Sequence, residues 1–254
     1  MTVTFSDLGK WKELTRTAKY KSQTVGFVPT MGALHEGHAS LFHRSVSENN
    51  ITVASIFVNP TQFNNPNDLE KYPSTLTSDL EMLTDIGVDY VLLPMAEDMY
   101  KDDYNYKLTE SKISHLLCGR FRPGHFEGVM TVVLKLLNLV RPTHAYFGEK
   151  DYQQYLLVKG MVEALFLDVD IVACPTVRTD AGLALSSRNM RLNEGEKLKA
   201  QIFADELKSS RSCEDVAMFL KDKGFKVDYI EEHFGRRFGA VEVGSVRLID
   251  NVQL

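Results

Sequence analysis

The chain has 254 residues, of which 44% are hydrophobic and 25% are charged, with a formal net charge of −5. This composition is typical of a soluble globular protein, and the acidic balance argues against duplex nucleic acid as a partner. The length favours one domain of about 150–180 residues and a smaller second domain.

The N-terminus and the cysteines indicate the cellular compartment. The first 21 residues combine lysines and arginines with polar residues and have no apolar core, so we predict no secretory signal. No segment approaches the roughly 18 apolar residues of a membrane span, so we expect no membrane association. Cys118, Cys174 and Cys213 fit neither a disulfide framework nor a cysteine-based zinc site. We therefore expect a cytoplasmic protein.

Apolar, β-branched runs alternate with helical patterns along the first 175 residues. The runs predict strands at Val25–Val28, Ile51–Val58, Tyr90–Leu93, Ala145–Phe147 and Val169–Ala173, and the helical patterns lie near 37–48, 76–86, 126–140 and 152–166. This alternation is typical of a doubly wound parallel sheet, and continuously apolar strands fit a sheet covered on both faces. We predict a Rossmann-like α/β domain over residues 1–175.

The pattern changes after Pro175. Helices are predicted at Glu194–Lys208 and Cys213–Lys223, followed by short strands around Lys226–Glu231, Arg237–Val243 and Val246–Ile249. Glycines 235, 239 and 244 supply the turns. This order predicts a smaller C-terminal α+β domain over residues 176–254.

The first predicted strand leads into a segment that is typical of a phosphate site. Residues 29–41 read P-T-M-G-A-L-H-E-G-H-A-S-L, so a strand ends at Pro29 and a helix begins with His35 and His38. The three-residue spacing places both imidazoles on one helix face, where unpaired N–H groups and the dipole favour an anion. Gly32 and Gly37 allow close approach to the backbone. We interpret the segment as a nucleotide-phosphate site rather than as a histidine pair that only caps the helix.

Four further segments are rich in polar function: N-P-T-Q-F (59–63), R-F-R-P-G-H-F (120–126), G-E-K-D-Y-Q-Q (148–154) and L-S-S-R-N (185–189). Each alone is also typical of a turn, a solvated loop, a helix cap or a linker. Three of the four follow strands, however, and therefore reach the sheet edge at which ligands bind in such folds.

The chemistry of these segments suits adenylyl transfer. In-line attack on a phosphorus needs positioning and neutralisation of charge more than covalent help. The available cations and donors are Lys150, Arg188, His35, His38, Ser186 and Ser187, and the amides of Gln62 and Gln154 can orient a small hydroxylated substrate. The sequence has no nucleophile elbow and no P-loop, and H-E-G-H is one residue short of the H-E-x-x-H zinc helix.

These segments together resemble the pantothenate synthetase (pantoate–β-alanine ligase) family. The resemblance is carried by P-T-M-G-A-L-H-E-G-H, S-I-F-V-N-P-T-Q-F, R-P-G-H-F-E-G-V-M-T-V-V-L-K-L, F-G-E-K-D-Y-Q-Q and L-S-S-R-N. H-x-G-H alone marks the wider nucleotidyltransferase superfamily, whereas F-G-E-K-D-Y-Q-Q with N-P-T-Q-F is specific to the ligase. The match runs from Val25 to Arg191 and is weaker beyond.

The resemblance implies a two-step reaction of pantothenate biosynthesis. The pantoate carboxylate attacks the α-phosphorus of ATP, which gives pantoyl adenylate and pyrophosphate, with Mg²⁺ on the phosphates. β-Alanine then attacks the acyl carbon, which gives pantothenate and AMP. The resemblance also implies a homodimer.

The resemblance also implies the site residues. His38, His35, Lys150 and Arg188 are the expected catalytic residues, and His38 is the expected proton donor. The ATP site would comprise Met31, Gly32, Ala33, Leu34, His35, Glu36, Gly37, His38, Gly148, Glu149, Lys150, Asp151, Val177, Leu185, Ser186, Ser187 and Arg188. Gln62 would contact pantoate and β-alanine, Gln154 would contact pantoate, and Pro29, Asn59 and Arg122 would complete the substrate site. Asp79 would hold magnesium through water.

The chain departs from the family pattern near the domain boundary. Asp180 and Ala181 stand where Asp-Gly-Leu-Ala is usual, Ser74 replaces an arginine, and the C-terminal domain looks shortened. We expect the Leu185–Arg188 loop to lack apolar anchors, to be mobile, and to reach ATP only when the second domain closes.

Two other functions compete with this interpretation. One is a nucleotidyltransferase acting on a phosphorylated acceptor, which does not explain the two glutamines. The other is a catalytically silent nucleotide-binding module, which has no use for two histidines and two cations. A tRNA synthetase fragment is excluded by size and by the lack of a basic anticodon-binding domain.

Overall fold

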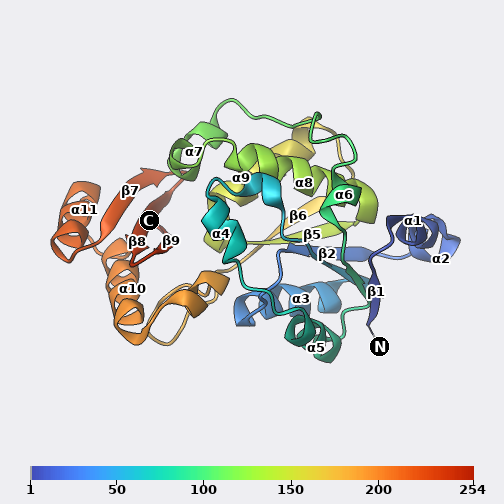
Figure 1. The fold of residues 1–254 in the computed structure, drawn as a ribbon, viewed down its shortest axis with the longest axis horizontal. Coiled ribbons are helices and arrows are strands. Elements are labelled where there is room, and N and C mark those ends of the chain that lie inside the picture. Colours follow the sequence, from blue (N-terminus) through green and yellow to red (C-terminus); the bar gives the residue numbers. More distant parts are fainter. Residues whose placement is uncertain (1) are drawn as a thin grey trace.

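The computed structural model describes residues 2–254, which form two sheets with helices around them (Figure 1). The larger sheet has six parallel strands in the order β1-β4-β3-β2-β5-β6. Its strands are β1 (Val3–Phe5), β2 (Val25–Thr30), β3 (Ile51–Ile56), β4 (Tyr90–Leu92), β5 (His144–Gly148) and β6 (Asp170–Cys174). The five predicted strands and the α/β class are confirmed. The sequence analysis missed β1, which is only three residues long and largely exposed.

Strand order reverses between β2 and β5. The chain runs from β2 outward through β3 to β4, and then returns to place β5 on the other side of β2, where Gly26 pairs with His144. In open parallel sheets, ligands bind at the carboxyl ends of the strands where the order reverses. Here the segments that follow these two strand ends are the histidine turn and G-E-K-D.

Helices cover both faces of this sheet, as Figure 1 shows. The helices over residues 1–175 are α1 (Leu8–Arg16), α2 (Ala18–Lys21), α3 (Glu36–Glu48), α4 (Pro66–Glu70), α5 (Leu76–Ile86), α6 (Ala96–Met99), α7 (Leu117–Phe121), α8 (His125–Val140) and α9 (Tyr152–Ala164). Neighbouring strand residues enter different cores: Phe27 packs with α8 and α9, whereas Val28 packs with α3 and α5. This two-sided burial explains the continuously apolar strands.

The C-terminal part has helices α10 (Glu194–Leu207) and α11 (Cys213–Asp222) beside an antiparallel sheet of β7 (Lys226–His233), β8 (Arg236–Val243) and β9 (Val246–Gln253). The predicted helices and strands are confirmed, although hairpin pairing extends β7 and β9 beyond their predicted ends. Asn193 and Glu196 form a capping box that starts α10.

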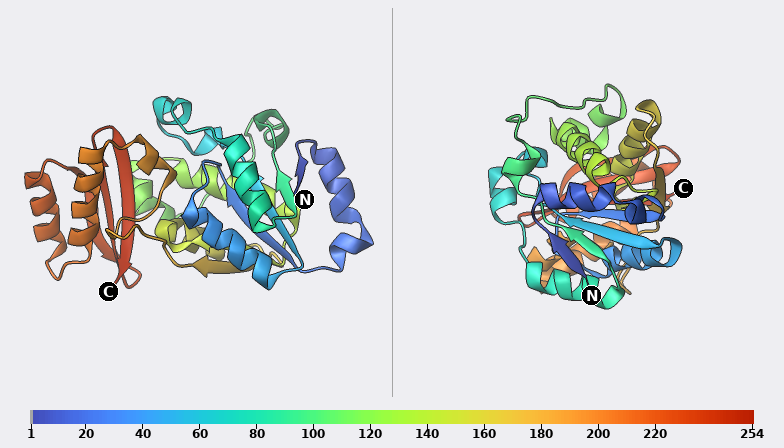
Figure 2. Two further views of the ribbon diagram at one scale, coloured as in Figure 1. Left: turned by 90° about the horizontal axis from the view of Figure 1, so that it is seen from below. Right: turned by 90° about the vertical axis from the view of Figure 1, so that its right-hand side faces the viewer.

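The small sheet contributes to two hydrophobic cores. One face, with Val241 and Leu248, packs under α10 and α11, whereas Tyr229 and Phe238 join the core of the first region. Figure 2 shows the C-terminal elements gathered at one end of an elongated molecule. The predicted boundary at residue 176 lies between the end of β6 and Leu183, the first residue of the C-terminal core.

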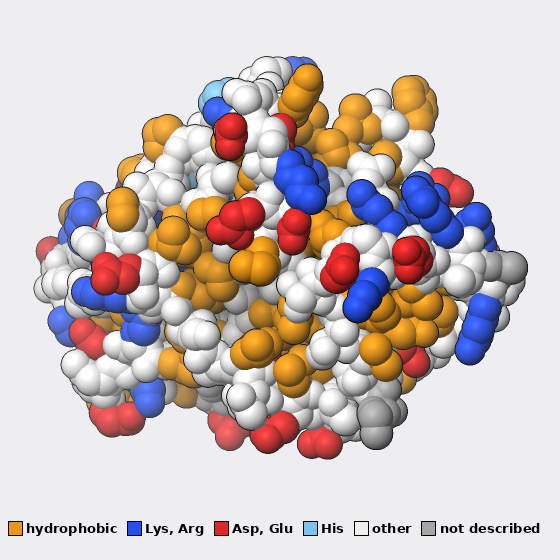
Figure 3. Space-filling view, turned by 45° about the vertical axis from the view of Figure 1, so that its right-hand side comes forward, with side chains coloured by type: hydrophobic (Ala, Val, Ile, Leu, Met, Phe, Trp, Pro, Cys, Tyr) orange, Lys and Arg blue, Asp and Glu red, His pale blue; other side chains and the backbone are white. Residues whose placement is uncertain are grey.

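The distribution of surface charge and the lengths of the helices are relevant to nucleic-acid and membrane partners. On the face drawn in Figure 3, lysines and arginines are interspersed with acidic side chains rather than gathered into one patch. Among residues 2–254, no helix is both long and apolar enough to cross a membrane. The expectation of no nucleic-acid partner stays a prediction.

Candidate active site

A cavity of about 320 Å³ opens at the point where the strand order reverses. Most of the predicted site residues line it: Pro29, Met31, His35, Gly37, His38, Asn59, Gln62, Arg122, Gly148, Lys150, Asp151, Gln154, Val177, Leu185, Ser186, Ser187 and Arg188. Gly32, Ala33, Leu34, Glu36 and Glu149 do not line it. The structure therefore brings all five polar segments of the sequence together around one space.

His35 and His38 lie side by side at the start of α3. His35 is the N-cap residue, and its Nδ1 accepts a hydrogen bond from the Gly37 backbone N–H at 3.1 Å. A neutral His35 must therefore carry its proton on Nε2. The two ring centroids are 4.1 Å apart, and a Cβ on Gly37 would come within 2.8 Å of the His35 ring. Glycine at this position leaves room for the His35 ring beside His38.

Both imidazoles are neutral at physiological pH. Burial, with the nearby positive charge of Lys150 as a further cause, lowers the pKa of His35 to about 4. Burial and the neighbouring His35 lower the pKa of His38 to about 3. Nδ1 of His38 is buried and has no hydrogen-bond partner among the described residues. Neutral rings at an anion-binding helix terminus act as hydrogen-bond donors rather than as cations.

Asp79 has a structural role that the sequence did not reveal. Its buried carboxylate accepts hydrogen bonds from the backbone N–H groups of Ala33 and Leu34, both at 2.9 Å, and from the Thr75 hydroxyl at 3.0 Å. Ala33 has φ of 51°, which is costly for a residue with a Cβ. Asp79 thus holds the histidine turn in shape and does not line the cavity, and its water-mediated magnesium role stays a prediction.

The side-chain amide of Gln62 has a fixed orientation. The Asn59 Nδ2 group donates to Gln62 Oε1 at 2.9 Å, while the Asn59 Oδ1 atom accepts from the Tyr100 hydroxyl at 2.6 Å. Gln62 Nε2 contacts the Met31 sulfur at 3.1 Å. The amide therefore presents its N–H groups on the side of the histidine turn. Tyr100 was missed because nothing in its local sequence marks it.

Arg122 is a cation with an unusual partner. Its Nη1 lies 3.0 Å from His125 Nε2, and His125 Nδ1 lies 2.8 Å from the Gln62 carbonyl oxygen. Burial, with Arg122 as a further cause, lowers the pKa of His125 to about 3, so the neutral ring donates to the carbonyl and accepts from Arg122. No salt bridge to Arg122 occurs among residues 2–254. The guanidinium is available to an anion in the cavity.

The two adjacent glutamines of G-E-K-D-Y-Q-Q have separate roles. Gln153 is buried and fixes the start of α7, since it accepts from the Cys118 backbone N–H and donates to the carbonyls of Ile113 and Leu116. Both glutamines line the cavity, but the side chain of Gln153 is committed to these backbone contacts.

The Leu185–Arg188 segment is anchored to the first region. The Ser187 hydroxyl donates to the Ala33 carbonyl at 2.9 Å, and Arg188 donates to Asp68 at 2.9 Å. Arg191 binds the other oxygen of Asp68 at 2.8 Å. The segment thus meets the first region in this structure, whereas its mobility and the need for domain closure to reach ATP stay predictions. Polar anchors from a distant part of the chain, invisible in the local sequence, take the place of the apolar ones.

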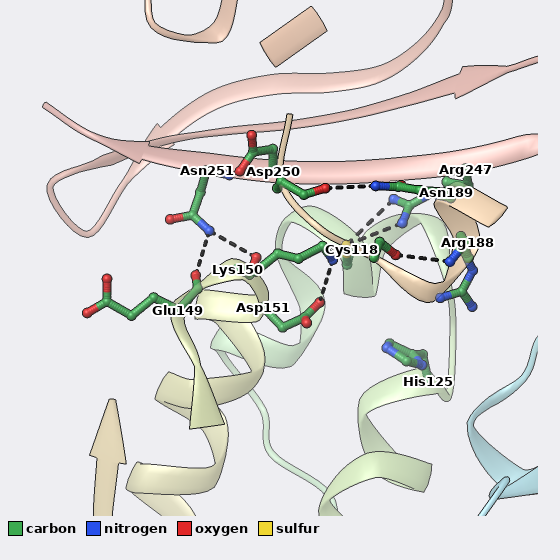
Figure 4. Close-up of polar contacts among 12 residues, drawn as sticks. Cys118, His125, Glu149, Lys150, Asp151, Arg188, Asn189, Arg247, Asp250 and Asn251 are labelled. Atoms are coloured by element: carbon green, nitrogen blue, oxygen red, sulfur yellow. Dashed lines mark hydrogen bonds and ion pairs between the residues drawn. The ribbon is translucent and has the colours of Figure 1, made fainter. Parts of the chain in front are cut away.

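The C-terminal strand also reaches the site. Figure 4 shows Asn251 directed at the turn that carries Glu149 and Lys150, with Lys150 extending toward Asp151. Asp250 forms a two-point ion pair with Arg178, with contacts of 2.6 and 2.9 Å. Arg178, Asp250 and Asn251 were not among the sequence-predicted site residues.

No group of three or more histidine, cysteine, aspartate or glutamate side chains among residues 2–254 is placed to hold a metal ion. Asp151 is a carboxylate that lines the cavity beside Lys150, with Oδ1 3.6 Å from Lys150 Nζ. Magnesium commonly keeps several waters and uses one or two carboxylates together with substrate phosphates. The residues of this cavity fit only a magnesium ion that is held mainly by water and substrate phosphates.

A helix N-terminus with two neutral imidazoles and nearby cations, at the reversal point of a parallel sheet, is typical of a nucleotide-dependent transfer enzyme. The comparisons with known proteins identify the particular family. A family model described as pantoate-beta-alanine ligase matches residues 3–253. The chain belongs to this family.

Relatives match over nearly the whole chain. The pantothenate synthetases of Legionella pneumophila (strain Corby) and Coxiella burnetii (strain Dugway 5J108-111) are 51% and 53% identical, over 98% and 99% of this chain and 99% and 97% of theirs. The pantoate-beta-alanine ligase of Francisella tularensis, solved with beta-gamma ATP and beta-alanine, has a TM-score of 0.95 at 40% identity, covering 100% and 98% of the two chains.

This coverage bears on the C-terminal part of the chain. The family match includes the residues beyond Arg191, since the family model extends to residue 253. The C-terminal domain is not short by comparison with these relatives, because 97–99% of each is covered. Membership also excludes the alternatives of a different nucleotidyltransferase and of a silent module.

Proposed function

We propose that this protein condenses pantoate with β-alanine in two ATP-dependent steps, through pantoyl adenylate, and releases pyrophosphate and AMP. The observation that carries the proposal is the cavity in which the neutral pair His35 and His38 shares one wall with Lys150, in a chain of the pantoate-beta-alanine ligase family. The Francisella relative was solved with ATP- and β-alanine-type ligands, which supports the same substrate classes here.

The phosphates of ATP would lie at the N-terminus of α3. Backbone groups of the histidine turn (Met31–His38) and of the turn 148–151 would contact the nucleotide, and Val177 and Leu185–Arg188 would close the opposite side. Gly32, Ala33, Leu34, Glu36 and Glu149 do not line the cavity, so their contribution is through the shape of the backbone. Helix N–H groups and the dipole favour the triphosphate at this point.

The catalytic roles follow from charge. Attack by the pantoate carboxylate builds negative charge on the phosphoryl oxygens and on the leaving pyrophosphate. His35 and His38 would donate hydrogen bonds to these oxygens from neutral rings, while Lys150 and Arg188 would supply positive charge. Donors that are already in place stabilise such a transition state without reorganisation.

Pantoate would lie between the two glutamines. Gln62 presents N–H groups whose direction Asn59 fixes, and Gln154 lines the same cavity. Pro29 forms part of the wall beside them. Neutral amides can orient the hydroxyl groups without pairing with the carboxylate, which must remain nucleophilic.

Arg122 suits the carboxylate of β-alanine better than that of pantoate. A strong ion pair would stabilise the pantoate carboxylate in the ground state and slow its attack. The carboxylate of β-alanine does not react, so pairing it with Arg122 only helps binding. Because Arg122 and His125 both contact the Gln62 carbonyl, the amine would arrive beside Gln62.

Magnesium would be held chiefly by the triphosphate and water, with Asp151 as the nearby carboxylate. When bound, it would neutralise phosphate charge. A cytoplasmic location and a homodimer remain proposals. The homodimer rests on the family resemblance, and sedimentation analysis of the purified protein tests it.

Isotope exchange tests the proposed reaction. Labelled pyrophosphate should enter ATP when pantoate is present without β-alanine, and adding β-alanine should yield AMP and pantothenate. Exchange that needs no pantoate, or formation of ADP and phosphate, would contradict the mechanism. Lys150→Ala serves as the negative control for the exchange, because it removes a proposed phosphate contact but leaves the proposed pantoate contacts in place.

A further inference from the structure

Asn251, near the end of β9, is buried and uses its whole side-chain amide. Nδ2 donates to the Glu149 carbonyl at 2.8 Å and to the Lys150 carbonyl at 3.0 Å. Oδ1 accepts from Arg236 at 2.9 Å. Two consecutive carbonyls of the first region are thus held by a single side chain from the C-terminal sheet.

The orientation of this amide is fixed by a residue that can only donate. Arg236 has no acceptor atom, so Asn251 must turn Oδ1 toward it and Nδ2 toward the turn. Arg236 is itself held, because it donates to the Glu149 carboxylate at 2.7 Å and lies 4.1 Å from the Tyr152 ring centroid. The contacts form a closed ring from the Glu149 side chain through Arg236 and Asn251 back to the Glu149 carbonyl.

The turn that Asn251 holds carries a cation of the proposed ATP site. Glu149–Asp151 form a short 3-10 turn between β5 and α9, and Lys150 lines the cavity. In Figure 4, Asn251 lies above this turn while the Lys150 side chain extends away from Asn251 toward Asp151. Asn251 does not line the cavity, so it acts on the ligand only through the backbone that it holds.

We propose that Asn251 is a positioning residue that sets the place of Lys150 against the phosphates of ATP. The inference rests on the proposed function only in taking ATP as the ligand. A displacement of about 1 Å in a group that contacts the reacting atoms is enough to cost a large part of its effect. The C-terminal sheet therefore contributes to phosphate binding through a residue that never touches the nucleotide.

A double-mutant cycle on ATP binding tests the proposal. Asn251→Leu keeps the size and removes both donors, and calorimetry gives the dissociation constant for ATP. We expect it to rise about tenfold, the scale of one weakened charge-assisted hydrogen bond. In a Lys150→Ala background, the same substitution should change the constant less than about twofold, since coupled residues are non-additive.

The matched control is Asn138→Leu, because Asn138 is exposed on α8 and bonds only its own helix at Leu134. It should leave ATP binding unchanged. Equal effects of Asn251→Leu in both backgrounds, or no effect in the native one, would overturn the proposal. If Asn251→Leu does not fold by circular dichroism, Asn251→Ser keeps one donor and is judged by the same criterion.

The result is independent of the proposed reaction. Coupling between Asn251 and Lys150 in ATP binding, without pantoate-dependent pyrophosphate exchange by the native protein, would support the positioning role and contradict the ligase mechanism. Pantoate-dependent pyrophosphate exchange without coupling between Asn251 and Lys150 would support the ligase mechanism and contradict the positioning role.

Discussion

Arg188 and Asp68 form an ion pair of 2.9 Å at the cavity, between the C-terminal region and α4. Arg191 binds the second oxygen of the same carboxylate at 2.8 Å. These arginines and burial act on Asp68 in opposite directions, and the net result is a lowered pKa, so the carboxylate is charged at neutral pH. The arginine proposed to bind ATP phosphates is therefore held by a protein anion in this structure.

Removing that anion should strengthen ATP binding. In Asp68→Asn, Arg188 no longer has to leave a charged partner, and a partly exposed ion pair contributes about 0.2–1 kcal/mol. We expect a dissociation constant for ATP that is lower by a factor of about two to five, measured by calorimetry. Asp168→Asn, at an exposed position outside the cavity, is the control. Weaker ATP binding would show that Asp68 serves as an anchor instead of a competitor.

The Leu185–Arg188 segment should be protected before ATP binds. The backbone N–H of Leu185 donates to Val177 and that of Asn189 donates to Ser186, and Ser187 anchors the segment to Ala33. Hydrogen exchange at residues 183–190 of the free protein should therefore be slower than in an unstructured peptide. Ser187→Ala should accelerate it. Exchange at the intrinsic rate without ATP would mean that the anchored state is not the main one in solution.

Removing one residue that donates a hydrogen bond to the phosphates should lower turnover more than it weakens the binding of pantoate. We expect His38→Ala and Lys150→Ala to lower kcat by about 10²–10³ each, the scale for one lost donor to developing charge. Gln154→Ala should mainly raise the KM for pantoate. His43→Ala removes an exposed histidine from the same helix and is the control. A normal kcat for His38→Ala would remove that residue from the mechanism.

Buried neutral histidines should make the free energy of unfolding depend on pH. Burial lowers the pKa of His35 to about 4 and the pKa values of His38 and His125 to about 3, whereas an unfolded histidine has a pKa of about 6.5. Protons therefore bind the unfolded state preferentially, so the stabilisation is present above about pH 6.5 and is lost as the pH falls toward 4.

Thermal melts at several pH values check this expectation. The fall in Tm between pH 7.5 and 5 should be smaller in His38→Gln and His125→Gln than in the native protein, each compared with its own value at pH 7.5. His43→Gln, at an exposed position, should behave like the native protein. An unchanged fall in both buried-site variants would refute the assignment.

Local sequence determined the strands, the longer helices and the chemistry of the site. Hydrophobic runs and helical periodicity located every strand except β1, and the histidine turn and G-E-K-D were placed correctly at the carboxyl ends of β2 and β5. This succeeded because burial on two faces and glycine-dependent turns are encoded in consecutive residues. Short pieces such as α4 and α6 carry too few residues for a periodic signal.

Only the tertiary structure decided what the remaining polar residues do. Asp79 holds the backbone of the histidine turn, Gln153 is structural where Gln154 is not, and Asn251 grips a turn about a hundred positions earlier in the chain. Each role depends on which hydrogen-bonding groups burial brings within about 3 Å, and a buried polar atom must find a partner wherever the fold supplies one. Residue type states what a side chain can donate or accept, whereas its partner is set by contacts between distant segments.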